Sequence, residues 1–293
     1  MKYLSIREII DEAKKNKVKI SELVKNEQVK DIKEYNDVSV TTIYSKMKDA
    51  YQVMCNSIDM GLKEKCNLKI EQEGGAKIYN KYVNEGKSIF GNKIGSAVAM
   101  ALAVSELNAS MGKIVAAPTA GSCGILSAAI VSIKNIYNID EEKVVDSLFT
   151  ASAIGMVISN VMNIAGASGG CQAECGVAQG MAAAAIVEML DGDYDQIENA
   201  IAISLKNIEG LVCDPVAGLV ECPCIKRNAS GVINAILAAD MALAGIKSII
   251  PVDEVILAMK QVGDVMDDRL KETAMGGLAA TETGKKLKKK IFN

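Results

Sequence analysis

The sequence predicts an all-α protein, and two observations carry this prediction. Apolar residues recur at helical spacing in segments 177–190, 197–208 and 230–244, whereas runs of alternating Val, Ile and Thr are scarce. Hydrophobic residues make up 49% of the chain but aromatic residues only 4%, and Trp is absent. The core is therefore built from small and aliphatic side chains, which favour closely packed helices. We expect a multi-helix globular domain with Gly- and Pro-rich loops between its helices.

The length of 293 residues suits one large domain, or a large domain with a small appendage. Residues 1–75 are expected to form an N-terminal helical segment of short, charged amphipathic helices, opened by a capping box from Ser5 to Glu8. After the break at 73–75 the composition shifts to Ala, Gly, Ser and Met. We expect residues 76–293 to form the main domain, continuous with the first segment as one folded unit.

The charge pattern argues against two classes of partner. A net charge of -3 gives no basis for binding nucleic acid or an anionic membrane, and the basic stretch 285–290 is interpreted as a solvated helix end. The uncharged stretches 114–133 and 147–173 are long enough to span a bilayer. Pro118 and the Gly/Ser cluster at 166–170 interrupt them, which is typical of buried helices in a non-membrane protein.

The chain has eight cysteines and no recognisable secretory leader at its start, so we expect a cytoplasmic protein. A disulfide framework is not expected, because that compartment is reducing and the core is large enough without cross-links. Cys55, Cys66 and Cys123 are interpreted as small buried apolar residues. Metal binding or redox chemistry is the alternative for the others.

Five cysteines fall in two stretches, 169–176 and 213–224, which Gly and Pro residues mark as loops. Thiolates in such loops can converge on a metal where the backbone approaches closely. His is absent from the chain, so only structural zinc or an iron-sulphur cluster remains. The Cys-x3-Cys, Cys-x8-Cys and Cys-x-Cys spacings fit zinc poorly and a cluster better. The five are Cys171, Cys175, Cys213, Cys222 and Cys224.

Several motifs together resemble one known family. They are Asn-Ala-Ser-Met-Gly at 108–112, Ala-Pro-Thr-Ala-Gly-Ser at 117–122, Gly-Gly-Cys-Gln-Ala-Glu at 169–174 and Gly-Leu-Val-Cys-Asp-Pro-Val-Ala-Gly-Leu-Val-Glu at 210–221. The likeness continues through 226–229, 238–245 and 276–281 and covers nearly the whole chain. The sequence resembles the alpha subunit of iron-sulphur-dependent L-serine dehydratase.

The resemblance implies that Cys171, Cys213 and Cys224 hold a [4Fe-4S] cluster. Cys175 and Cys222 stand where relatives are expected to have an aliphatic residue, so each could replace its neighbour as a ligand. The implied reaction converts L-serine to pyruvate and ammonia without pyridoxal phosphate, with one open cluster iron as Lewis acid. The chain lacks the second domain of single-chain members and their terminal cysteine, so the implied partner is a separate beta subunit.

The residues that would act on serine are less defined. With no His, the general base has to be Lys, Glu, Asp or Cys of this chain, or a residue of the beta chain. Polar residues in loops could bind the substrate carboxylate or ammonium, although an N-cap or turn role is an equal alternative for each. These candidates are Lys87, Ser88, Thr119, Ser122, Arg227 and Asn228.

Three other functions are compatible with parts of the sequence. A cysteine desulphidase of the same fold would release sulphide instead of water, and activity on L-cysteine alone would identify it. A non-catalytic cluster sensor would show no turnover when combined with the beta chain. A helical membrane protein, such as a transporter core, would fractionate with membranes and require detergent.

Overall fold

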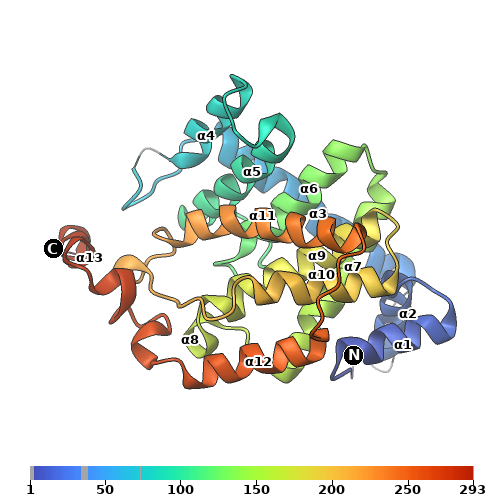
Figure 1. Cartoon of the computed structure of the whole chain (residues 1–293). Coiled ribbons are helices and arrows are strands. Elements are labelled where there is room, and N and C mark those ends of the chain that lie inside the picture. Colours follow the sequence, from blue (N-terminus) through green and yellow to red (C-terminus); the bar gives the residue numbers. More distant parts are fainter. Residues whose placement is uncertain (1–2, 34–38, 73, 293) are drawn as a thin grey trace.

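A computed structural model describes residues 3–33, 39–72 and 74–292, and these ranges form an all-α fold without a β-strand (Figure 1). The expected fold class is therefore confirmed. The helices are α1 (Ile6–Asn16), α2 (Ile20–Lys33), α3 (Val40–Lys63), α4 (Gly75–Asn84), α5 (Gly91–Ala109), α6 (Cys123–Tyr137), α7 (Glu141–Val161), α8 (Gly166–Gly169), α9 (Val177–Met189), α10 (Tyr194–Lys206), α11 (Cys224–Leu243), α12 (Val252–Val265) and α13 (Glu282–Phe292).

Helix α9 is the centre of the molecule. Every residue of this helix is buried, and it packs against α6, α7, α10 and α11. The run Ala182–Ala185 leaves little side-chain volume on the helix, so neighbouring helices approach it closely from all sides. This explains how a core with so few aromatic residues remains closely packed.

Four helices run between the two ends of the molecule. Asn228 in α11 bonds the backbone N–H of Gly124 in α6, and Asn108 near the end of α5 bonds the carbonyl of Ala120 before α6. Helices α6, α9 and α11 thus begin at one end, where α5 finishes. We call this the loop end, formed by residues 108–123, 162–176, 210–224 and 266–280. The distal end holds the start of α5 and the last turns of α6, α9 and α11.

The first helix shows how the N-terminal segment is attached. The Ser5 side chain accepts from the Glu8 N–H, as expected, but the Glu8 carboxylate accepts from the N–H of Leu4, one residue earlier than a capping box requires. The N–H of Ile6 donates to Asp253 Oδ1 at 2.7 Å, which joins α1 to the start of α12. The boundary between an N-terminal segment, residues 1–75, and a main domain, residues 76–293, stays a prediction.

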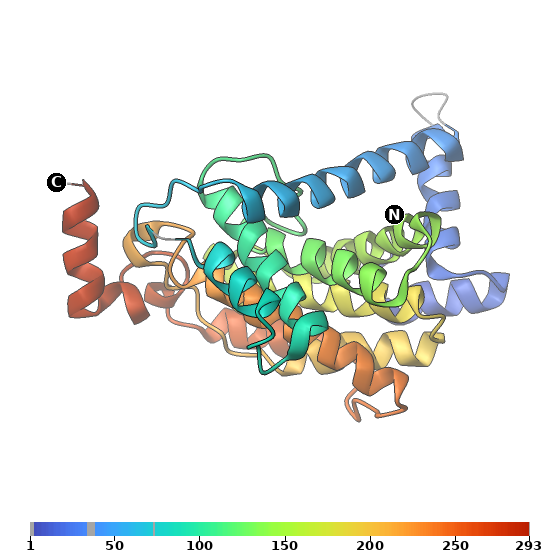
Figure 2. The same ribbon diagram turned by 90° about the horizontal axis from the view of Figure 1, so that it is seen from above.

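The first and last helices lie far apart. Figures 1 and 2 show α13 projecting from the molecule at the left, whereas α1 lies at the other side beside the start of α12. The lysines of the basic stretch 285–290 are exposed on α13. Their position agrees with a solvated helix end.

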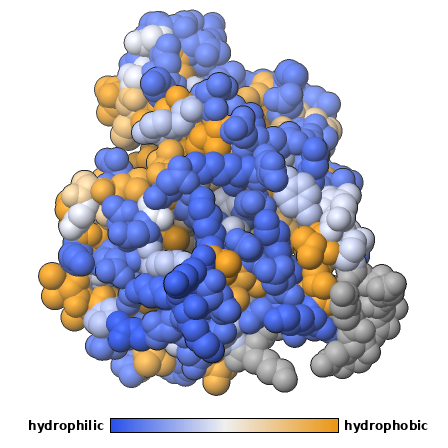
Figure 3. Space-filling model, turned by 90° about the vertical axis from the view of Figure 1, so that its right-hand side faces the viewer, coloured by the Kyte–Doolittle hydropathy of each residue, from blue (hydrophilic) through white to orange (hydrophobic). Residues whose placement is uncertain are grey.

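One helix of the described ranges, α7, is long and apolar enough to cross a membrane. Within its most apolar window, 67% of the residues are buried inside the fold, as in a core helix of a globular protein. The face shown in Figure 3 is largely hydrophilic, with apolar side chains scattered over it.

Candidate cysteine site at the loop end

The chain brings three cysteines to the loop end from two connections, the one before α9 and the one between α10 and α11. Cys171 precedes a π-helical turn, Gln172–Gly176, that continues into α9. Cys213 lies between α10 and α11, and Cys224 is the first residue of α11. The expected placement of all five cysteines in loops is therefore wrong for Cys175 and Cys224, which belong to helical turns. The first turns of α11 escaped the sequence reading because Lys226, Arg227 and Asn228 do not follow the apolar spacing of a helix.

Backbone pairing attaches a distant segment to Cys213. Its N–H donates to the carbonyl of Leu270 at 2.8 Å, and its carbonyl accepts from the N–H of Glu272 at 2.7 Å. This isolated bridge fixes residues 270–272 beside the cysteine and presents the Glu272 side chain to the same space.

The pKa values of the thiols reflect their mutual proximity. Burial raises the pKa of Cys213, and the charge of Cys171 raises it further. Burial likewise raises the pKa of Cys224 to about 12, with a contribution from Cys171. The three sulphur atoms therefore interact electrostatically across one shared space. Within the described ranges, no group of three cysteine or acidic side chains has the arrangement that one bound metal ion requires.

Cys171 differs from the other two thiols because it has hydrogen-bonding partners. Its Sγ lies 3.3 Å from the Sγ of Cys175. The hydrogen bond from Cys175 lowers the pKa of Cys171, burial opposes this, and the positive charge of Arg227 lowers it again. Cys171 is therefore the thiol of this group that loses its proton most readily.

The two spare cysteines occupy different surroundings. Cys175 is fully enclosed and serves as the hydrogen-bonding partner of Cys171. Cys222 is partly exposed, and after burial the charges of Glu71 and Lys226 affect its pKa most. Cys222 is therefore the more exposed of the two spare cysteines, whereas Cys175 lies beside Cys171.

A half-buried carboxyl group, Glu174, faces the same space. Burial raises its pKa, whereas a hydrogen bond from the Thr119 hydroxyl lowers it and the charge of Glu272 raises it further. A Cβ atom at Gly166 would lie 2.9 Å from Cys213 Sγ and 3.3 Å from Glu174 Oε2. Only glycine at this position leaves room between the thiol and the carboxyl group.

Arg227 joins the cysteines to the C-terminal segment. Its guanidinium donates to the carbonyl of Val212 and to Asp214 Oδ1, both at 2.8 Å. The other oxygen of Asp214 accepts from the N–H of Leu278 at 2.7 Å, and a Cβ at Gly277, where φ is +55°, would lie 2.3 Å from it. The buried pair holds segments 212–214 and 277–278 together.

The remaining predicted substrate residues divide into two groups. Thr119, Ser122 and Asn228 lie at the loop end with Arg227. The Asn228 side chain donates to the carbonyls of Gly121 and Cys224, at 2.7 and 2.9 Å, so its amide hydrogens serve to position the loop. The Ser122 hydroxyl lies 3.1 Å from that of Thr119.

The structure does not bring Lys87 and Ser88 to the cysteines. They lie in the turn between α4 and α5, where Lys87 pairs with Glu85 at 2.7 Å and the buried Ser88 hydroxyl accepts from the N–H of Phe90 at 3.3 Å. These contacts describe a local turn. Their role in binding substrate stays a prediction.

Sequence reasoning missed two residues that shape the loops. Glu221 is buried and accepts from the N–H groups of Lys69 and Ile70 at 2.9 and 2.7 Å. Gln172 donates to the carbonyl of Met259 at 2.9 Å and accepts from the N–H of Gly210 at 2.8 Å. Both occur in the quoted motifs, but their partners are distant in the sequence, so no local pattern could reveal them.

The fold and the site define an all-α protein in which two buried thiols, one partly buried thiol, a carboxyl group and an arginine meet at the start of α9 and α11. Residues 15–279 match the family model described as "Serine dehydratase alpha chain". The chain belongs to this family.

Curated relatives agree with this membership. The chain is 47% identical over 284 residues to "L-serine dehydratase, alpha chain" of Peptoniphilus asaccharolyticus, covering 97% of this chain and 96% of that protein. It is 46% identical to "Probable L-serine dehydratase, alpha chain" of Bacillus subtilis, covering 99% and 95%. With "L-serine dehydratase" of Streptomyces coelicolor it is 40% identical over 79% of this chain, but only 52% of that protein is covered.

Proposed function

We propose that this chain is the cluster-bearing catalytic subunit of an L-serine dehydratase, a lyase that converts L-serine to pyruvate and ammonia. The observation that carries the proposal is the meeting of three cysteines from two connections with Glu174 and Arg227 at the loop end. The names of the relatives support serine as the substrate. We place the enzyme in the cytoplasm, because abundant free thiols suit a reducing compartment.

The residues at the loop end fit a [4Fe-4S] cluster. The donor set consists of thiols only, which is the chemistry that such clusters use. Cys171, Cys213 and Cys224 would hold it, and Gly166 keeps the space beside Cys213 free of a side chain. The charge of Cys171 raises the pKa values of Cys213 and Cys224, so a bound cationic centre would relieve this repulsion as the thiols lose their protons.

A cluster held by three protein ligands would keep one iron open. That iron would supply the Lewis acid that stabilises the departing hydroxide of serine. The rest of the work falls to the chain. Arg227 places a positive charge beside Cys171, and through Asp214 it fixes the segment around Leu278. The proposed effect is a cluster site whose shape does not relax as charge develops.

Glu174 is the group of this chain that we propose as general base. It faces the thiols, it is half-buried, and burial raises its pKa, which makes its carboxylate a better proton acceptor. The Thr119 hydroxyl donates to it and fixes its orientation. Removal of the α proton of serine with loss of hydroxide gives aminoacrylate, which tautomerises and hydrolyses to pyruvate and ammonia.

For substrate binding we retain all six residues predicted from the sequence, but we propose different roles for them. Thr119, Ser122 and Arg227 lie at the loop end and are proposed to contact serine directly. Asn228 is proposed to position the loop, since both of its amide hydrogens are engaged. Lys87 and Ser88 would require a second binding place at the α4–α5 turn.

A separate beta subunit is the proposed partner. The two alpha-chain relatives are matched over nearly their full length, whereas the Streptomyces protein has almost as much chain again beyond the match. In our proposal, a second chain supplies what that additional length provides. The N-terminal segment 1–75 and the domain 76–293 would act as one unit.

The experiment is anaerobic purification of the chain together with its beta subunit, followed by assays for pyruvate from L-serine and from L-cysteine. Pyruvate from serine that disappears after exposure to air is the expected result, because an open cluster iron is labile. Activity on cysteine alone would replace the proposal with a desulphidase. A cluster-loaded complex inactive on both amino acids would contradict any catalytic role.

A further inference from the structure

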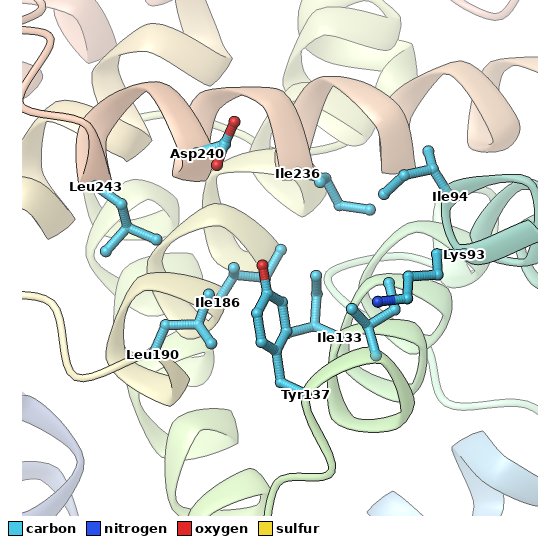
Figure 4. A pocket seen from close by; sticks show the side chains of 10 residues that line it. Lys93, Ile94, Ile133, Tyr137, Ile186, Leu190, Ile236, Asp240 and Leu243 are labelled. Carbon is cyan, nitrogen blue, oxygen red and sulfur yellow. The ribbon is translucent and has the colours of Figure 1, made fainter. Parts of the chain in front are cut away.

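A pocket of about 280 Å³ lies at the distal end, far from the cysteines. It is formed by the start of α5 and by the last turns of α6, α9 and α11 (Figure 4). Its apolar lining includes Ile133, Ile186 and Ile236. A cavity of this size is at the small end of those that bind metabolites.

Three polar side chains border this apolar space. Lys93 comes from α5, Tyr137 from α6 and Asp240 from α11. Figure 4 shows the Lys93 ammonium and the Tyr137 hydroxyl directed toward one region, with Asp240 on the helix across the pocket. Opposite charges are thus presented from different walls of one apolar pocket.

These polar groups have no protein partners. Within the described ranges, the side chains of Lys93, Tyr137 and Asp240 are exposed at the rim of the pocket and make no ion pair or hydrogen bond. By contrast, Lys143 pairs with Asp191, which lies in the turn after α9. A ligand that carries both charges would find its counter-charges free in the pocket.

We propose that this pocket binds a free aliphatic α-amino acid. Its carboxylate would contact Lys93 and the Tyr137 hydroxyl, its ammonium would contact Asp240, and its branched side chain would pack on Ile186 and Ile236. Burial of the aliphatic group provides most of the affinity, and the two charges select a zwitterion over an apolar acid or amine.

The position of the pocket gives it a physical connection to the loop end. Helix α11 begins with Cys224 and reaches Asp240 after sixteen residues, about 24 Å at 1.5 Å per residue. Helices α6 and α9 span the same two ends. This amino-acid site is therefore separate from the proposed serine site, and it does not depend on the proposed reaction.

The test is calorimetric titration of L-isoleucine into the full chain. We expect saturable binding to the wild type, and at least about tenfold weaker binding to Asp240→Asn and to Lys93→Gln. The matched controls are Asp49→Asn and Lys46→Gln, which make the same changes on exposed positions of α3. Binding by the controls is expected to equal that of the wild type.

Analogues separate the contribution of each charge. The 2-oxo acid of isoleucine lacks the ammonium and 2-methylbutylamine lacks the carboxylate, so both should bind at least about tenfold more weakly. Isoleucine binding should persist with serine in excess. The proposal is overturned if isoleucine does not bind, if both pocket variants bind it like the wild type, or if serine displaces it. Because binding is measured without turnover, a chain inactive on serine still gives a clear answer.

Discussion

The loop end and the distal end differ in how their backbone turns are made. At the distal end, the left-handed residues that directly follow α6, α9 and α11 are Asn138, Asp191 and Gly245, types that accept a positive φ readily, although Ile249 further along the connection after α11 is also left-handed, with φ of 69°. At the loop end Ala217 and Glu272 have φ values of 59° and 60°. Neither residue favours that conformation.

The two ends also treat buried polar groups differently. Glu188, near the end of α9, is a buried carboxyl group whose pKa is raised by burial. Hydrogen bonds from the Ser21 and Thr150 hydroxyls to this carboxyl group lower its pKa in part. Glu174, before the same helix, has a similar burial effect but faces thiols and a second carboxyl group. Backbone strain and crowded titratable groups thus coincide only at the loop end, as expected of a functional site.

The largest expected effect comes from removing a cluster thiol. Cys213→Ala should lose the iron, the sulphide and the activity of the complex, because two thiolates cannot retain the cluster. Iron and sulphide analysis with the pyruvate assay measures this. Cys123→Ala is the matched control, since Cys123 is also buried but its thiol donates to the carbonyl of Val104, 3.9 Å away, and is not a proposed ligand.

The same assay distinguishes the neighbouring cysteines. Cys224→Ala should behave like Cys213→Ala, whereas Cys222→Ala should keep its cluster because Cys222 is partly exposed and is not a proposed ligand. The reverse result would make Cys222 the ligand and contradict the assignment of Cys224.

The second effect compares two carboxyl groups, Glu174 in the turn before α9 and Glu188 in α9. Glu174→Gln should lower kcat by about 10²–10⁴-fold, the usual contribution of a general base. In the wild type, kcat should fall as the pH falls through the raised pKa of Glu174, because the base is then protonated. The variant should lack this decline.

Glu188→Gln is the control for that pH profile. Its carboxyl group is also buried with a raised pKa, but it contacts only hydroxyl groups and a backbone N–H. The decline of kcat at low pH should therefore remain. Its loss in Glu188→Gln, or its persistence in Glu174→Gln, would remove Glu174 as the base.

A smaller effect is expected from Arg227→Lys, which keeps the charge but loses the planar donor pair that reaches Val212 and Asp214. Cluster affinity should fall by about 10–100-fold, as is usual when a group supporting a metal ligand is changed. Chelator-dependent loss of cluster absorbance measures this. Equal rates of loss in variant and wild type would limit Arg227 to a structural role.

The smallest effect concerns backbone strain. Ala217→Gly should stabilise the chain by less than about 1 kcal/mol, because relief at a left-handed position is partly offset by the greater freedom of glycine when unfolded. Asn138→Gly, at the distal end, should change stability by only a few tenths of a kcal/mol, since Asn tolerates this conformation. Urea unfolding midpoints give the comparison.

Much of this protein was determined by the sequence alone. Apolar spacing predicted the later helices to within a few residues, apart from the early start of α11, because helical periodicity is a local property. The absence of His and the clustering of cysteines near Gly and Pro restricted the possible metal chemistry, and the motifs predicted the family that the comparisons then showed.

The tertiary structure decided which residues meet. Glu174 faces Thr119 and Cys213, and Cys213 pairs with the backbone of residues 270–272, while Lys87 remains in a distant turn. The distal pocket likewise combines Lys93 with Asp240 from helices far apart in the chain. Sequence periodicity specifies each helix and its buried face, but contacts between loops depend on how all the helices pack, which no local pattern encodes.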